Sequence, residues 1–167
     1  MSDNGFTPSV IVFACNWCSY AGGDMAGISR IQYPSTNRIV RTMCSARVSE
    51  EMVLEAFRCG APVVLVSGCH YADCHYINAN RQTYERMQRL WNKLEKNGIR
   101  PERLQLEWIS AAEGQKFAKV MHQMEDLRRG VTPEEIDRSR EVLKPKPKKP
   151  KRPEAATLPE SATAASD

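Results

Sequence analysis

Two short runs of apolar residues constrain the fold of this chain more than any other feature. Residues 10–14 read VIVFA, and residues 61–69 read APVVLVSGC. Both runs are rich in β-branched side chains and lack the alternation of a half-exposed strand, which is typical of strands covered on both faces. Because parallel strands are joined by helices that cover the sheet, these runs predict a parallel α/β fold.

Two weaker strands and five helical patterns complete the predicted fold. Residues 37–44 form one strand candidate, and residues 103–110 alternate apolar and polar side chains like a half-exposed edge strand. The helical patterns cover residues 19–31, 50–59, a stretch around 87–94, 117–127 and a segment that opens at Thr132. The alternating order predicts a four-stranded, mostly parallel sheet sandwiched by helices.

Charge is distributed unevenly along the chain. Residues 144–167, which begin KPKPKKPKRP, contain six cations and three acids and leave 18 cations and 17 acids elsewhere. We therefore expect a flexible N-terminus (1–9), an α/β domain (10–130), a C-terminal helix (131–143) and a disordered basic tail (144–167). Prolines interrupt the basic run, no aromatic residues accompany it, and the domain is nearly neutral, so we expect no nucleic-acid partner.

The cysteines follow the ends of the predicted strands. Five of the six are expected at the carboxyl edge of one sheet: Cys15, Cys18, Cys44, Cys69 and Cys74. Open α/β sheets bind their ligands at that edge. The sixth, Cys59, lies at the end of the helix 50–59 and is expected to be a packing residue.

Three kinds of cysteine site remain open from the residues alone. The CNWC motif of Cys15 and Cys18 is typical of a thioredoxin-like thiol oxidoreductase. The same pair with Cys69 and Cys74 could hold a structural zinc ion in an interaction module, with nearby histidines as substitutes. An iron–sulfur cluster would need four of the five thiols, although the spacing matches neither common ferredoxin pattern. Trp17, between the first two cysteines, either shields such a site from water, docks against a partner or packs beneath its loop.

The start of the chain and its hydropathy bear on where it works. The segment MSDNGFTPS has neither the basic nor the apolar region of a secretory signal, and no apolar run approaches the ~20 residues of a membrane span. We therefore expect a cytoplasmic protein without a membrane span. Six cysteines in a reducing compartment favour metal or redox chemistry over a disulfide scaffold.

Four stretches of the sequence resemble one known family. They are CNWCSYAGGDMAGISRIQYP at 15–34, VRTMCSARV at 40–48, VSGCHYADCHY at 66–76 and LEWISAAEGQKFA at 106–118. Together they resemble the delta subunit of methyl-viologen-reducing hydrogenase, and the resemblance extends from about Val10 to Leu127. The Lys/Pro-rich tail is not part of that family's pattern.

The resemblance implies a non-catalytic electron relay with one [2Fe–2S] cluster. The implied ligands come from the five cysteines at the predicted edge: Cys15, Cys18, Cys44, Cys69 and Cys74. The implied partners are a hydrogenase, formate dehydrogenase or similar electron donor and the flavin-containing A subunit of a heterodisulfide reductase-type complex. Complexes of that type perform flavin-based electron bifurcation.

Overall fold

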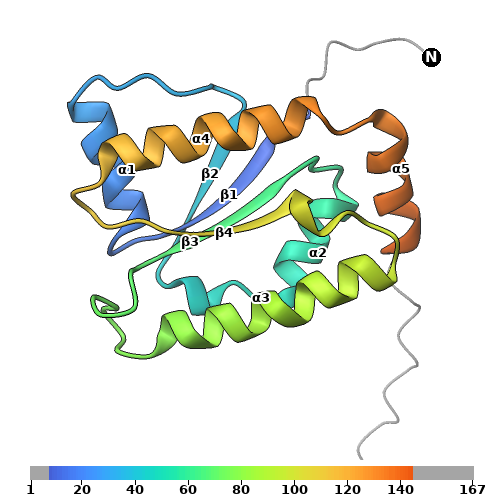
Figure 1. The fold of residues 1–167 in the computed structure, drawn as a ribbon, viewed down its shortest axis with the longest axis horizontal. Coiled ribbons are helices and arrows are strands. Elements are labelled where there is room, and N and C mark those ends of the chain that lie inside the picture. Colours follow the sequence, from blue (N-terminus) through green and yellow to red (C-terminus); the bar gives the residue numbers. More distant parts are fainter. Residues whose placement is uncertain (1–7, 145–167) are drawn as a thin grey trace, which may run out of the picture.

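The computed structural model describes residues 8–144 of the chain, so residues 1–7 and 145–167, which contain most of the predicted flexible N-terminus and basic tail, lie outside it. The described chain is a three-layer α/β sandwich around one sheet (Figure 1). Its strands are β1 (Val10–Cys15), β2 (Asn37–Thr42), β3 (Val64–Gly68) and β4 (Leu104–Trp108). Its α-helices are α1 (Ser19–Ile28), α2 (Glu50–Arg58), α3 (Ala79–Lys96), α4 (Gly114–Arg129) and α5 (Pro133–Val142).

The sheet has the strand order β2-β1-β3-β4, and every neighbouring pair is parallel. The predicted fold class is therefore confirmed, with four parallel strands where the sequence indicated a mostly parallel sheet. The predicted edge strand is β4, which pairs only with β3 and is half-buried along most of its length. The central strands β1 and β3 are nearly or completely buried, as their apolar runs predict.

Alternating side chains of β1 enter two separate hydrophobic cores. Val10, Val12 and Ala14 face the core that α1 and α4 close, whereas Ile11 and Phe13 face the core of α2 and α3. Figure 1 shows these helix pairs on opposite sides of the sheet, with α5 beside α2. No helix of residues 8–144 is long and apolar enough to cross a membrane.

Local sequence signals fix the helix ends. The Ser49 hydroxyl accepts a hydrogen bond of 3.2 Å from the Met52 N–H at the start of α2. Thr132 and Glu135 form a capping box at the start of α5. Gly60, just after α2, has φ +95°, a backbone conformation that favours glycine.

One cysteine departs from its predicted place. Cys59 was expected to pack in the core, but it is exposed, and its sulfur points toward a Glu55 carboxylate oxygen 3.7 Å away. The reason is that α2 ends at Arg58, which leaves Cys59 in the turn beyond the helix rather than on its buried face. The prediction for Cys59 is therefore wrong.

Candidate metal centre

Three cysteine sulfurs meet at the point where the chain reverses its direction across the sheet. After β1 the chain crosses to β2 on one side, and later enters β3 on the other side of β1, so β1 and β3 flank a topological switch point. Cys15 ends β1, Cys18 precedes α1, and Cys69 follows β3. All three are buried, and their Sγ atoms lie within 4.8 Å of one another, with 3.8 Å between those of Cys15 and Cys69.

The other two predicted cysteines lie beside this group. Cys74 is half-buried and packs against the three buried thiols. Cys44 is also half-buried and lies two residues past β2, rather than at the strand end that the sequence predicted. The residues on either side of it touch Cys15: the carbonyl oxygen of Met43 lies 3.9 Å from the Cys15 sulfur, and the N–H of Ser45 donates to that sulfur.

Ionisation of one of the three buried thiols disfavours ionisation of the other two. Hydrogen bonds from Cys18 and Cys69 lower the pKa of Cys15, so its sulfur is the first to become a thiolate. Its hydrogen bond with Cys15 raises the pKa of the Cys18 thiol. A separate hydrogen bond with Cys15 raises the pKa of the Cys69 thiol to about 11. The three thiols therefore accommodate one thiolate and oppose the ionisation of the other two. A bound cation would remove this opposition, because metal ligation deprotonates coordinating thiols.

Backbone N–H groups supply further support for charged sulfur. Those of Trp17 and Ser45 donate to Cys15, and that of His75 donates to Cys69. Hydrogen bonds of this kind to cysteine sulfurs tune iron–sulfur clusters. An all-sulfur donor set, buried and surrounded by N–H donors, therefore fits a thiolate-bound metal ion or cluster.

Two buried polar side chains that sequence reasoning missed hold the cysteine backbone in place. The Ser19 hydroxyl accepts from the Cys15 N–H at 2.9 Å and donates to the Ser67 carbonyl at 3.2 Å, which ties β1, α1 and β3 together. The Asn80 amide donates to the Cys69 carbonyl at 3.3 Å. The position of Ser19, directly after the CNWC motif, is the one sequence signal that could have identified it.

The two histidines of this region have other partners. His70 Nε2 lies 2.7 Å from a carboxylate oxygen of Glu113, which also accepts from the Ser110 N–H at 2.7 Å. The Ser110 hydrogen bond, followed by that of His70, lowers the pKa of Glu113 to about 2. His75 stacks on Trp17. Neither histidine belongs to the group of ligand atoms that lie within 4.8 Å of one another.

Trp17 covers the cysteine loops from outside. Its ring stacks on that of His75, with 3.9 Å between centroids and 11° between planes, and its Nε1–H donates to the Tyr76 hydroxyl at 3.3 Å. The side chain is 43% exposed, so it does not pack beneath its own loop. It joins the loop after β1 to the loop after β3.

Exposed apolar side chains surround the same loops, and we call them the edge patch: Trp17, Met43, Tyr71, Tyr76 and Ile77. Ile77 is 79% exposed and has φ +63°. A β-branched residue in that left-handed region is a true outlier, at a cost of about 1–2 kcal/mol. Strain of this kind collects at functional sites.

The fold and the site together define an α/β protein with a group of buried cysteines, suited to hold a metal, at the carboxyl edge of a parallel sheet. A family model described as methyl-viologen-reducing hydrogenase, delta subunit, matches residues 10–129. The chain belongs to this family, as its four motifs predict.

Relatives with curated names support the same assignment. The chain is 43% identical over 133 residues to the iron-sulfur D subunit of the vhc F420-non-reducing hydrogenase of Methanococcus voltae, covering 80% of this chain and 92% of the relative. It is 45% identical over 131 residues to the iron-sulfur D subunit of the F420-non-reducing hydrogenase of Archaeoglobus profundus, covering 78% and 96%.

A third relative is much longer than this chain. It is the A subunit of the ferredoxin/F(420)H(2)-dependent CoB-CoM heterodisulfide reductase of Methanosarcina acetivorans, which is 49% identical over 116 residues, or 70% of this chain. The match spans only 15% of that relative. A region similar to this chain is therefore part of a larger reductase protein in that organism.

Proposed function

We propose that this chain is an electron-transfer subunit that holds one [2Fe–2S] cluster at the candidate metal centre. It would relay electrons between a hydrogenase, formate dehydrogenase or similar donor and the flavin-containing A subunit of an electron-bifurcating, heterodisulfide reductase-type complex. The observation that carries the proposal is the meeting of three buried sulfurs within 4.8 Å at the switch point of the sheet. Relatives that are named iron-sulfur subunits support iron and sulfide as the occupant.

The proposed ligands are Cys15, Cys18 and Cys69, with the fourth from Cys74 or Cys44. The first three are already together, and the other two are half-buried beside them. When bound, the cluster would supply reversible uptake and release of single electrons. The residues around it have three tasks: the N–H groups stabilise charge on sulfur, Ser19 and Asn80 fix the loops, and Trp17 limits access of water.

The proposed partner is the A subunit of a heterodisulfide reductase-type complex. Because a region similar to this chain occurs within such a protein in Methanosarcina acetivorans, the two parts are expected to work in contact when they are separate chains. The edge patch is the proposed contact surface, since it is apolar, exposed and directly beside the cysteines. Docking there would bring the partner's cofactor closest to the cluster.

Two alternatives lose support from the geometry and the family. A Cys15–Cys18 oxidoreductase needs two thiols, but the Cys69 sulfur lies 3.8 Å from that of Cys15 and would compete for the disulfide. A zinc-binding interaction module is compatible with the sulfurs, whereas the relatives are named for iron and sulfur. The cytoplasmic location and the lack of a nucleic-acid partner stay predictions.

A reductive titration tests the proposal on anaerobically purified protein. We expect the visible absorption to bleach after uptake of one electron per chain, with an electron paramagnetic resonance signal of about one spin per chain. Uptake of two electrons by a colourless protein with an oxidised Cys15–Cys18 pair would instead establish the thiol oxidoreductase. A colourless protein that takes up no electrons and contains zinc would establish the interaction module.

A further inference from the structure

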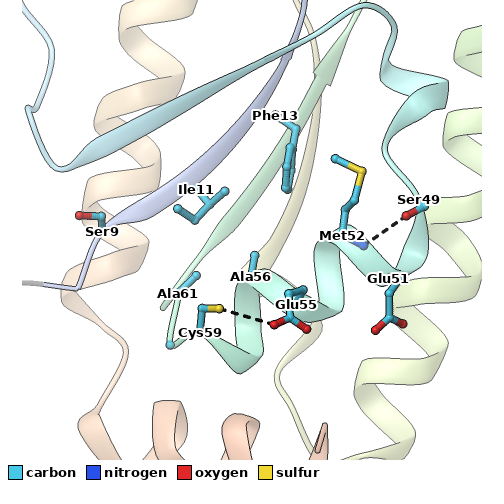
Figure 2. Close-up of a pocket in the computed structure, with 11 residues that line it drawn as sticks. Ser9, Ile11, Phe13, Ser49, Glu51, Met52, Glu55, Ala56, Cys59 and Ala61 are labelled. Atoms are coloured by element: carbon cyan, nitrogen blue, oxygen red, sulfur yellow. Dashed lines mark hydrogen bonds between the residues drawn. The ribbon is translucent and has the colours of Figure 1, made fainter. Parts of the chain in front are cut away.

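An apolar groove lies away from the cysteine loops, between β1 and α2. Its volume is about 620 Å³. Ile11 and Phe13 form its floor on the sheet, and Met52, Ala56 and Cys59 line it from one face of α2 and the turn after it. Figure 2 shows Met52 pointing from the helix toward Phe13.

The groove exists because α2 does not cover the edge of the sheet. The helix packs toward β3 and α5, while β2 lies on the other side of β1. On β2, Val40 is the register partner of Phe13 and is 40% exposed. The apolar floor therefore continues onto the edge strand, with no helix of residues 8–144 over it.

The rim of the groove touches the last described turn of the chain. Arg58 donates through Nη1 to the carboxylates of both Glu51 and Glu55, which line the groove. Through Nε the same guanidinium donates to the carbonyl of Leu143, one residue before the described chain ends. Residues 145–167 therefore continue from a point beside an apolar groove that has two carboxylates at its rim.

The segment that follows has the matching chemistry. Residues 144–153 read KPKPKKPKRP, in which Pro147, Pro150 and Pro153 recur every third residue. A polyproline II helix has three residues per turn and rises ~3.1 Å per residue, so these prolines would share one edge and the cations would occupy the others. Ten residues would span roughly 30 Å, about twice the ~14 Å length of a nine-residue α-helix. The segment is long enough to run the full length of α2.

We propose that residues 144–153 bind in this groove as a polyproline II helix within the same chain. The proline edge would lie on Phe13 and Met52, as proline-rich segments lie in aromatic-lined grooves, and the cations would lie along Glu51 and Glu55. Such binding would cover the apolar floor. It is independent of the proposed electron transfer, because the cysteines of the candidate metal centre do not line the groove.

Cys59 provides the test, because it is exposed and lines the groove. The rate at which maleimide alkylates Cys59 is measured by peptide mass spectrometry in the full chain and in a chain that ends at Lys144. We expect alkylation at least tenfold slower in the full chain. The peptide KPKPKKPKRP added to the shortened chain should restore the protection, whereas KKKPPKPPKR, of the same composition, should not.

Full-length variants separate proline spacing from charge. Replacing Pro147, Pro150 and Pro153 with glycine keeps every cation and should expose Cys59 as fully as the truncation does. The matched control is Pro145→Gly, which lies off the shared edge and should leave Cys59 protected. Equal alkylation rates in the full and shortened chains would overturn the proposal. Protection that rises with protein concentration would overturn it too, in favour of a second copy as the occupant.

Discussion

The two edges of the sheet are built in opposite ways. At the amino edge, the buried charges each have several hydrogen-bond partners within the protein. Arg103, 2% exposed, precedes β4 and donates to the carbonyls of Pro62, Ala61 and Glu135 and to the Ser139 hydroxyl, at 2.6–3.2 Å. The desolvated guanidinium has its pKa lowered to about 10 but stays charged at neutral pH.

At the carboxyl edge, the buried groups are thiols that share protons and oppose one another's ionisation. The loops there also expose apolar side chains and hold Ile77 in a strained conformation. The difference is that the buried charges of the amino edge are paired within the folded chain. The carboxyl edge is the location of the proposed metal centre and of the proposed contact with a protein partner.

The largest effect that would test this contrast is the loss of the proposed cluster. Changing Cys69 to serine removes one of the three central sulfurs, so we expect loss of most of the iron and visible absorption of the anaerobically purified protein. Cys59→Ser is the matched control and should keep the wild-type spectrum, because Cys59 is exposed and lies outside the centre. Full iron content in Cys69→Ser would contradict the proposed ligand set.

The second effect concerns the amino edge. Arg103→Met leaves buried carbonyls without donors, and we expect a loss of about 3 kcal/mol in the free energy of unfolding, measured by urea denaturation. The control Arg100→Met removes an exposed ion pair with Glu135 and should cost under about 1 kcal/mol. Both variants should keep the absorption spectrum. Equal losses for the two would contradict the role given to Arg103.

The third effect is a pH dependence at the same edge. The Arg128 hydrogen bonds, with those of Thr36 and Arg129, lower the pKa of Glu125 from 4.5 to about 2. A lowered carboxyl pKa contributes stability that is present above pH 4.5 and lost as the pH falls toward 2. We expect Glu125→Gln to lower the free energy of unfolding by about 2 kcal/mol at pH 7. The variant should also lose less stability than the wild type as the pH falls from 4.5 to 2, a part of the pH profile that we call the acid limb.

The measurement for Glu125 is urea denaturation at a series of pH values from 7 to 2. The control is Asp126→Asn, a change of the same kind at the exposed neighbouring residue. It should leave the acid limb as in the wild type. An unchanged acid limb in Glu125→Gln would show that the carboxylate is not held by its partners as described.

The smallest effect tests the strain at the carboxyl edge. Ile77→Gly removes the side chain from a left-handed conformation and should raise the free energy of unfolding by about 1 kcal/mol. Ile28→Gly is the matched control at an equally exposed isoleucine, 81% exposed at the end of α1. Because that position is helical, the control should lose about 0.5–1 kcal/mol. A loss in both variants would show that Ile77 carries no strain.

Much of the fold could be predicted because hydrophobic periodicity reports burial directly. The uninterrupted apolar runs identified β1 and β3 as central strands, and the caps at Ser49 and Thr132 located two helix starts. Strand ends were less certain, since Cys44 lies beyond β2 rather than at its end. The failure at Cys59 has the same origin: periodicity does not reveal which side of a helix terminus faces solvent.

The position of the cysteines could be predicted in outline because the carboxyl ends of parallel strands lie at one edge of a sheet. Which sulfurs meet depends on tertiary geometry, so the central group of Cys15, Cys18 and Cys69 emerged only from the structure. The Asn80 side chain donates to carbonyls ten and eleven residues earlier, across the loop after β3, and this spacing follows no helix or strand period. The choice between iron–sulfur and zinc was settled by neither spacing nor geometry, and it rests on the family.

Metal and sulfide analysis of the anaerobically purified full chain tests the central claim most directly. We expect about two irons and two acid-labile sulfides per chain, with zinc well below one. One zinc per chain without sulfide, or a protein free of metal, would contradict the claim.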